Sequence, residues 1–353
     1  FSEDCIGPEV SLAVVHDGGH SPVLLQPVAA PGLSEPKWVR IQMEWLPDQL
    51  HLIRVVLLHV VIPGIPDVVV ELPGLGDADL HAGDLLGVGQ GSRRESFIAI
   101  MHWNGAPDKD TPPVAFVGKG VTFDTGGLDM KSPAHMVLMK KDMGGAAIAI
   151  ALAYLIMKRN LPIQLRLLIP AAENSISGNA FRPGDILTTR KWLTVEVDNT
   201  DAEGRLLLCD ALALACEERP ELIVDFATLT GAARSAVGTE ISAMFTHSDL
   251  IAEKLYKQGE FNADPLWRLP LHESYNKMLE SKVADLVNSA SSGYAGAITA
   301  ALFLNNFLED TSSWVHFDVM AYNLNTMPGK PEGGEGMAMR AVFAYLEETY
   351  GQT

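Results

Sequence analysis

The pattern of hydrophobic positions divides the chain into two parts. Residues 1–80 contain nine of the 21 prolines and no long helical period, and we expect only short strands there, at Val10–Val15 and Ile41–Leu46. From about Leu85 onward, apolar segments of strand length alternate with segments of helical length. This alternation predicts an α/β fold, a central mixed but mostly parallel sheet with helices on both faces.

The predicted elements of this second part follow from the length and period of each apolar segment. The predicted strands are Phe97–Met101, Val114–Val117, Ile163–Ile169 and Leu222–Ala227. The predicted helices are Gly144–Arg159, Gly204–Glu218 and Ala295–Leu308. The longest apolar run has 12 residues, Ala146–Met157. Because a membrane-spanning helix needs about 20 residues, we expect no membrane association.

Charge and cysteine content narrow the classes of function. The chain has 353 residues and a net charge of −18, which disfavours a broad surface for nucleic acid or anionic lipid. Cys5, Cys209 and Cys216 form no C-x-x-C pair, so we expect neither a disulfide framework nor a thiolate zinc site. Free thiols suit a reducing compartment, and we expect a cytoplasmic protein. The chain begins with Phe1 and shows no signal peptide, which leaves a removed targeting segment open.

Two polar segments stand out against this background: residues 117–145 and residues 199–205. Lys119 follows an apolar strand, so its side chain should leave the carboxyl edge of the sheet, where open α/β sheets bind ligands. Glycines at positions 118, 120, 126 and 127 allow the backbone to turn and to approach a ligand.

Four carboxylates in these segments, those of Asp124, Asp142, Asp201 and Glu203, lie at predicted strand-to-helix junctions. If they meet at one sheet edge, they repel one another, and two divalent cations would balance their charge. Each residue alone also fits a structural role. Asp142 could cap the following helix, and Thr200-Asp201-Ala202-Glu203 matches a capping box. We expect His135, the one histidine within these segments, to be packed or solvated and not a ligand.

These segments resemble the leucine aminopeptidase (cytosol aminopeptidase) family of two-metal peptidases. Residues 199–206 are close to the signature octapeptide of that family, and residues 118–127 and 141–145 resemble its metal-binding stretches. Further similarity lies in Asp225, residues 227–232, residues 293–304, and the block with Trp314, His316 and Asp318. The resemblance covers about residues 85–350.

The resemblance implies a role for each matching residue. The five metal ligands would be Lys119, Asp124, Asp142, Asp201 and Glu203, holding two divalent ions (zinc, manganese or magnesium). Asp142 and Lys119 would serve the tighter metal, Asp124 and Glu203 would bridge both, and Asp201 would serve the exchangeable one. Lys119 would ligate as a neutral amine, which requires a lowered pKa.

The resemblance also implies the reaction, which is release of N-terminal amino acids from peptides by metal-activated water. Lys131 and Arg205 would be the catalytic pair that does not bind metal, with Lys131 stabilising the oxyanion and Arg205 holding a bicarbonate ion as general base. Six residues would line the substrate pocket: Met139, Asn199, Ala202, Thr228, Leu229 and Gly231. The mixed apolar lining favours an uncharged first residue such as Leu or Met, although Met139 and Leu229 could equally be core residues.

The chain departs from the family pattern in three places. Residues 319–323 and the loop 131–135 have unusual sequences, and Met320 and Asn323 leave the side-chain preference open. Family members carry a separate N-terminal domain, and we expect residues 1–40 to be a remnant of it and residues 41–353 to form the catalytic domain. A truncated chain, a processed chain and a family branch with a short N-terminal domain all stay open. That domain supports hexamers in the family, so the resemblance implies a homo-oligomer only weakly.

Two other classes of function stay open at this stage. One is a catalytically inactive relative that acts as a binding or structural protein, but all five ligand positions, Lys131 and Arg205 are intact. The other is a different two-metal hydrolase such as a phosphatase, for which the chain shows no P-loop.

Overall fold

The computed structural model describes residues 56–59, 68–72 and 81–351. The predicted strands Val10–Val15 and Ile41–Leu46 and the expected remnant segment 1–40 lie outside the described residues. Within the described part, no helix is both long and apolar enough to cross a membrane.

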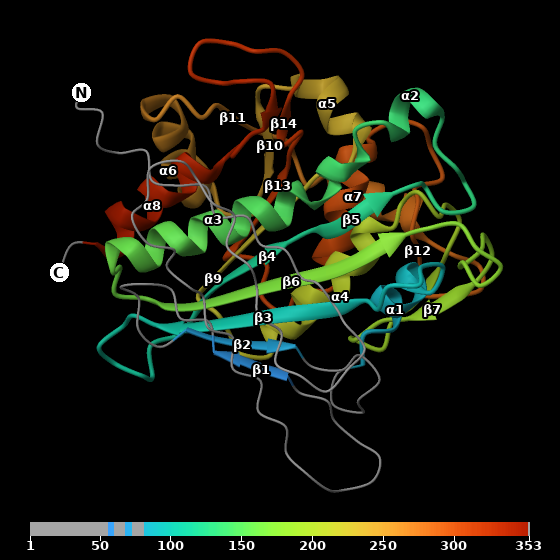
Figure 1. Ribbon diagram of the computed structural model, residues 1–353, viewed down its shortest axis with the longest axis horizontal. Helices are drawn as coiled ribbons and strands as arrows, with labels where there is room; N and C mark the ends of the chain where they lie inside the picture. Colours follow the sequence, from blue (N-terminus) through green and yellow to red (C-terminus); the bar gives the residue numbers. More distant parts are fainter. Residues whose placement is uncertain (1–55, 60–67, 73–80, 352–353) are drawn as a thin grey trace, which may run out of the picture.

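One ten-stranded sheet organises the molecule (Figure 1). Its order is β1-β2-β3-β6-β4-β9-β13-β10-β11, and β5 continues the line of β4 beside β6. The strands are β1 Val56–His59, β2 Val68–Leu72, β3 Phe97–Asn104, β4 Val114–Gly118, β5 Gly120–Asp124, β6 Gln164–Asn174, β9 Leu222–Ala227, β10 Ser242–Phe245, β11 Leu266–Arg268 and β13 Trp314–Asp318. The four central strands β6, β4, β9 and β13 are parallel, whereas β1, β2 and β3 form an antiparallel edge. β10 is antiparallel to β13 and parallel to β11.

Helices cover both faces of the sheet, as the sequence predicts. One face carries α1 Gly83–Gly89, α4 Gly204–Cys216, α5 Gly231–Val237 and α7 Gly296–Asn305, and the other carries α3 Gly144–Arg159, α6 Asp249–Phe261 and α8 Met339–Tyr350. Successive residues of β4 alternate between the two cores: Val114 and Phe116 pack toward α3, and Ala115 and Val117 toward α4. Burial on both faces explains why the central strands read as continuous apolar runs.

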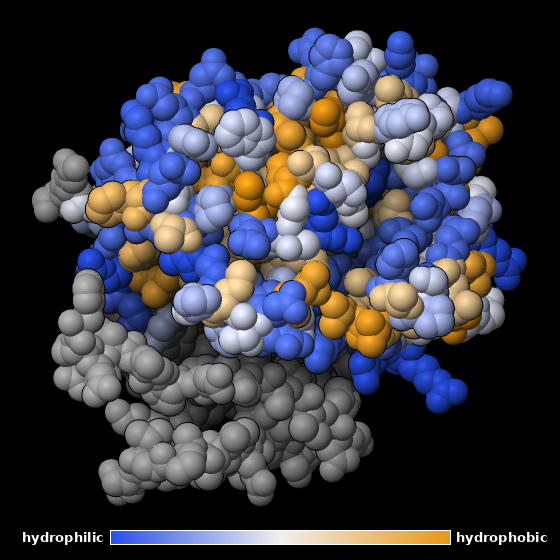
Figure 2. All heavy atoms as spheres, turned by 90° about the horizontal axis from the view of Figure 1, so that it is seen from above, coloured by the Kyte–Doolittle hydropathy of each residue, from blue (hydrophilic) through white to orange (hydrophobic). Residues whose placement is uncertain are grey.

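Short elements complete the chain around the sheet. They are the helix α2 Pro133–Met136, the 3₁₀ helices η1 Met139–Met143 and η2 Glu273–Leu279, and the small strands β7 Ile186–Thr188, β8 Thr194–Glu196, β12 Leu286–Val287, β14 Tyr322–Asn323 and β15 Gly333–Gly334. Figure 2 shows apolar residues among hydrophilic ones near the middle of the face seen from above.

The predicted elements agree closely with the structure. The predicted bounds of α3 and β9 are those observed, and the predicted helices at α4 and α7 are each a few residues too long. The prediction for β6 ended at Ile169, whereas the strand continues through Pro170 to Asn174. Pro170 is tolerated because the parallel ladder is interrupted beside it. Leu168 pairs with β4 and Ala171 with β5, so the missing N–H falls opposite the break at Lys119.

Candidate metal centre

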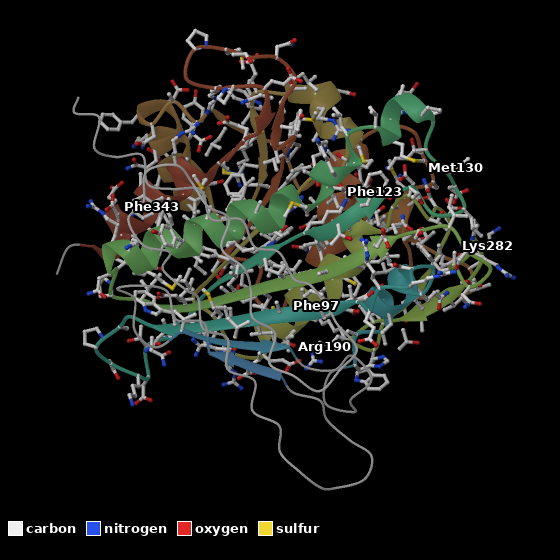
Figure 3. All side chains as sticks on the ribbon, viewed as in Figure 1. Phe97, Phe123, Met130, Arg190, Lys282 and Phe343 are labelled. Carbon is white, nitrogen blue, oxygen red and sulfur yellow. The ribbon has the colours of Figure 1, made fainter. Side chains whose placement is uncertain are left out.

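Two stretches that are distant in sequence, residues 117–145 and 199–205, bring their polar residues to the carboxyl edge of the central strands. Lys119 lies between β4 and β5, and Asp124 ends β5. Asp142 lies in η1 directly before α3, and Glu203 directly precedes α4. Figure 3 labels Phe123 and Met130, the neighbours of Asp124 and Lys131, on the side of the molecule where β5 ends.

Two glycines allow this convergence. Gly126 has a φ of +89°, and its N–H donates to Asp124 Oδ1 at 2.8 Å, which turns the chain immediately after the carboxylate. At Gly204 a Cβ atom would lie 2.7 Å from Lys119 Nζ. Any larger residue at the first position of α4 would therefore displace the lysine amine.

Lys119 joins two of the carboxylates. Its Nζ lies 2.8 Å from Asp142 Oδ2 and 2.9 Å from Glu203 Oε1, and it donates to the carbonyl oxygen of Thr228 at 3.2 Å. Burial lowers the pKa of Lys119, but the negative charges of Asp142 and Glu203 outweigh burial, so among these protein groups the pKa is raised. A metal-ligating amine needs the opposite shift, which only nearby cations could supply.

Lys131 joins the other two carboxylates. Its Nζ lies 2.7 Å from Asp124 Oδ2 and also contacts Asp201. One oxygen from each of Asp124, Asp201 and Glu203 lies within 4.8 Å of the others, which is close enough to hold one metal ion. The carboxylates therefore form two adjoining groups that share Glu203: one with Asp124 and Asp201, the other with Asp142.

The electrostatics of the cluster favour bound cations. Four carboxylates against two ammonium groups leave two negative charges unbalanced. Burial, and then the charge of Asp124, raises the pKa of Glu203 to about 8. Asp142 Oδ2 and Glu203 Oε1 are buried and meet only the Lys119 ammonium, and Glu203 Oε2 is buried with no donor among the described residues. Buried carboxylate oxygens without donors are costly unless a cation binds them, so this donor set fits divalent metal ions.

The helix-capping roles that the sequence also allowed for Asp142 and Thr200 are wrong. Asp142 does not cap α3, because the N-cap is Met143 and no side chain caps that end. It instead accepts from Thr228 Oγ1 at 2.7 Å. Thr200 does not form a capping box either: its hydroxyl donates to the Gly126 carbonyl at 2.6 Å, tying the octapeptide loop to the loop after β5.

Sequence reasoning missed two asparagines that position the ligands. Asn174, fully buried at the end of β6, donates to Asp124 Oδ1 at 2.9 Å and to the Thr200 carbonyl at 3.0 Å. Asn288 follows β12, and its side chain accepts from the N–H of Asp198 and Asn199 and donates to the carbonyl of Asn199 at 2.7 Å. A polar residue ending an apolar strand was a usable signal for Asn174, but nothing in the sequence near Asn288 indicates its contact almost 90 residues away.

Arg205 is a buried cation without an ionic partner among the described residues. Its side chain lies in the first turn of α4 with the guanidinium 5.8 Å from the Phe303 ring centroid. Its Nε and Nη1 have no acceptor, and burial lowers its pKa to about 10. An arginine held this way can take a small planar anion in two hydrogen bonds. His135, by contrast, is exposed on α2, as expected.

The six predicted pocket residues lie on three segments bordering the carboxylates. Met139 begins η1, Asn199 and Ala202 lie in the octapeptide loop, and Thr228, Leu229 and Gly231 follow β9. Asn199 Oδ1 accepts from the Asp201 N–H at 2.8 Å, so it also shapes the loop. Of the two unusual residues near this region, Met320 is buried, and Asn323 donates to Glu335 at 2.8 Å. Contact of the six residues with a substrate stays a prediction.

The parallel centre of this mixed sheet gathers four carboxylates and two lysines at its carboxyl edge, and such an arrangement defines a cation-binding site of the kind found in hydrolytic metal centres. The family model for the cytosol aminopeptidase family, catalytic domain, matches residues 77–343. The chain belongs to this family.

Individual relatives agree with this assignment. The chain is 42% identical over 295 residues to a probable cytosol aminopeptidase of Xanthobacter autotrophicus, covering 83% of this chain and 58% of that protein. The crystal structure of the cytosol aminopeptidase from Coxiella burnetii aligns with a TM-score of 0.77 and 50% identity, covering 80% of this chain and 61% of that one. The bottromycin maturation enzyme BotP, in a structure with Mn, aligns with a TM-score of 0.74 and 37% identity, over 80% of this chain and 62% of that one. The chain thus spans less than two thirds of the length of these relatives.

Proposed function

We propose that this chain is a metal-dependent aminopeptidase that releases N-terminal residues from peptides. The observation that carries the proposal is the convergence of Asp124, Asp142, Asp201 and Glu203 with two lysines at one sheet edge. Family membership and the names of the relatives support it.

The residues that would hold two divalent ions are Lys119, Asp124, Asp142, Asp201 and Glu203. When bound, such ions supply Lewis acidity and lower the pKa of water toward neutrality. The division of the carboxylates into two groups that share Glu203 supports a bridging role for this residue. Asp201, whose side chain is 33% exposed, suits the exchangeable ion, since it is the least enclosed of the four. Zinc, manganese and magnesium all suit this donor set, and the Mn complex of BotP supports manganese.

Lys131 and Arg205 would act on the substrate side of the centre. The Lys131 ammonium, which contacts Asp124 and Asp201, would stabilise negative charge that develops on the scissile carbonyl oxygen. Arg205, with Nε and Nη1 free, would hold a carboxylate-like anion such as bicarbonate in position to accept a proton. The ion pairs of Lys131 and the burial of Arg205 would restrict both side chains, which would keep reorganisation during the reaction small.

Three finer features belong to the same proposal. Met139 and Leu229 give the predicted pocket apolar walls, which favour a first residue such as Leu or Met. By analogy with relatives named cytosol aminopeptidases, we expect a cytoplasmic enzyme. We also expect a homo-oligomer, a hexamer by family resemblance, and a catalytic domain that spans residues 41–353.

The test is hydrolysis of leucine p-nitroanilide with and without added manganese or zinc, beside the N-acetylated substrate. Metal-dependent release from the free-amine substrate alone supports the proposal. If a folded sample with two bound metal ions per chain releases nothing, the aminopeptidase assignment is wrong and the chain is an inactive relative. Cleavage of a phosphate ester without cleavage of the anilide would instead indicate a phosphatase.

A further inference from the structure

A short turn after β9, residues 228–230, links the metal centre to the neighbouring strand of the sheet. The carbonyl oxygen of Thr228 accepts from Lys119 Nζ at 3.2 Å, and the Thr228 hydroxyl donates to Asp142 Oδ1 at 2.7 Å. Thr228 is buried, so water competes little for these contacts. Thr228 therefore contacts two of the five proposed metal ligands, one through its backbone and one through its side chain.

Asp318, the last residue of β13, holds this turn from its other side. β13 is parallel to β9, and Asp318 pairs with Ala227, the residue that directly precedes the turn. Asp318 Oδ1 accepts from the N–H groups of Leu229 and Thr230, both at 3.1 Å, and Oδ2 accepts from the Thr230 hydroxyl at 2.6 Å. Asp318 is buried, and both of its oxygens are thus committed to the turn.

The two contacts of Thr228 bear directly on metal binding. A neutral lysine amine binds a metal through its single lone pair, and an N–H of Lys119 directed to the Thr228 carbonyl restricts the rotation that would turn this lone pair away. At Asp142 the Thr228 hydroxyl occupies Oδ1 and leaves Oδ2, which lies 2.8 Å from Lys119 Nζ, for a cation. Hydrogen bonds of this kind orient metal ligands and contribute to metal affinity.

Asp318 reaches the ligands only through the turn. Among the described residues, none of its hydrogen bonds goes to a proposed metal ligand. Beyond the turn, Thr230 Oγ1 accepts from the Ala233 N–H at 3.0 Å and caps α5. Loss of the Asp318 carboxylate would deprive the Leu229 and Thr230 N–H groups of this acceptor, and the turn would shift to satisfy them elsewhere. Such a shift would move the Thr228 carbonyl and hydroxyl away from the two ligands.

We propose that Asp318 is a positioning residue of the metal centre: it holds the turn of residues 228–230 so that Thr228 orients Lys119 and Asp142 toward one of the two ions. This inference rests on the proposed two-metal function and adds a residue that touches neither metal ligand nor substrate. A purely structural anchor of the turn would instead stabilise the fold without changing metal affinity.

The experiment titrates the zinc-loaded full chain with a chelator of known zinc affinity and obtains the Kd of each ion from the zinc retained. We expect Asp318→Ala to raise the Kd of the tighter ion, which Lys119 and Asp142 would serve, by about 10-fold. Thr228→Val removes the hydroxyl and keeps the side-chain shape, and it should raise the same Kd by about 10- to 100-fold. Asp318→Asn keeps an oxygen for both N–H groups and should stay within about 3-fold of the wild type.

The matched control is Asp264→Ala. Asp264 is likewise buried and accepts from three backbone N–H groups, those of Ala338, Arg340 and Ala341 at the start of α8, at 2.9, 2.9 and 3.2 Å. None of these contacts reaches the turn or a proposed ligand. Urea unfolding of the metal-free proteins should therefore show a loss of stability in both alanine variants, whereas only Asp318→Ala should lose zinc affinity.

Two results would overturn the inference. One is an Asp318→Ala protein that is less stable but retains the tighter ion as the wild type does. The other is an equal loss of affinity in Asp318→Asn and Asp318→Ala, which would assign the effect to negative charge. If Asp318→Ala does not fold, Thr230→Val carries the test, since it removes the hydroxyl that donates to Asp318. It should raise the same Kd by about 3-fold or more, and unchanged affinity would overturn the inference.

Zinc affinity is measured without substrate, so the two proposals fail separately. Unchanged affinity in the Asp318 variants of a chain that cleaves leucine p-nitroanilide would overturn the inference and leave the aminopeptidase function standing. The expected loss of affinity in a chain that cleaves no anilide would support the positioning role and overturn the function. A chain that binds no zinc would overturn both.

Discussion

Asn288 offers the sharpest test of how the octapeptide loop is held. Its side chain is fully buried and makes four hydrogen bonds to this loop, accepting from Asp198 and Asn199 at 2.8 and 3.2 Å and donating to Asn199 and Ala202 at 2.7 and 3.4 Å. Asn288→Ala removes both the donor and the acceptor. The loop it releases carries Asp201 and Glu203.

The expected cost follows from these contacts. An unsatisfied buried polar group costs about 1 to 3 kcal/mol, and the change leaves two N–H groups and one well-bonded carbonyl without a partner. Asp198 is exposed and Asn199 only half-buried, so water would satisfy some of these groups. We therefore expect Asn288→Ala to lower the free energy of unfolding by about 2 to 4 kcal/mol. We also expect kcat to fall by about 10-fold or more, because small displacements of ligands are costly.

Two assays are needed. Equilibrium urea unfolding with a chelator present gives the free energy of unfolding without the contribution of bound metal, and steady-state kinetics give kcat of the metal-loaded protein. Asn262→Ala is the matched control, since Asn262 also makes two side-chain hydrogen bonds, but only to Gln258 at the end of α6. It should cost less than about 1 kcal/mol and leave kcat unchanged. A loss for Asn288→Ala no larger than for this control would refute the reasoning.

Three further predictions concern charge. Burial raises the pKa of Asp210 to about 7 from 3.8, and burial and Asp210 raise that of Asp84, so the folded state retains protons that the unfolded state releases. The free energy of unfolding should therefore fall as pH rises from about 4 to 7. In denaturant titrations Asp84→Asn should flatten this fall and stabilise the protein at pH 8 by about 1 to 3 kcal/mol. An unchanged pH profile would contradict the pairing of Asp84 with Asp210. Elemental analysis should find one metal ion fewer per chain in Asp201→Ala, and full occupancy in this variant would remove Asp201 from the ligand set. Chelation should lower the melting temperature of the wild-type protein, because bound ions stabilise the folded state. Arg205→Met should not lower the melting temperature, because it removes a buried unpaired charge. The kcat of this variant should fall by about 10- to 100-fold, and an unaltered kcat would exclude a catalytic role for Arg205.

The elements at the centre of the sheet could be predicted because their signals are local. The apolar run of Leu222–Ala227 and the helix Gly144–Arg159 were predicted with the observed bounds. The strand predicted at β6 ended too early, at Ile169, because a proline usually ends a strand. Only the neighbouring strands reveal that the missing N–H of Pro170 lies beside a break in the ladder.

Within the site, the sequence by itself determined the chemically active groups. Lysine and carboxylates at the ends of apolar strands must lie at one sheet edge, because parallel strands place their carboxyl ends together. Tertiary structure alone decided how these groups are held and what stands beside them. Asn174, Asn288 and Thr228 reach the ligands through contacts between distant segments. Such contacts are invisible in the sequence, because the partner of a side chain is known only when every neighbouring segment is in place.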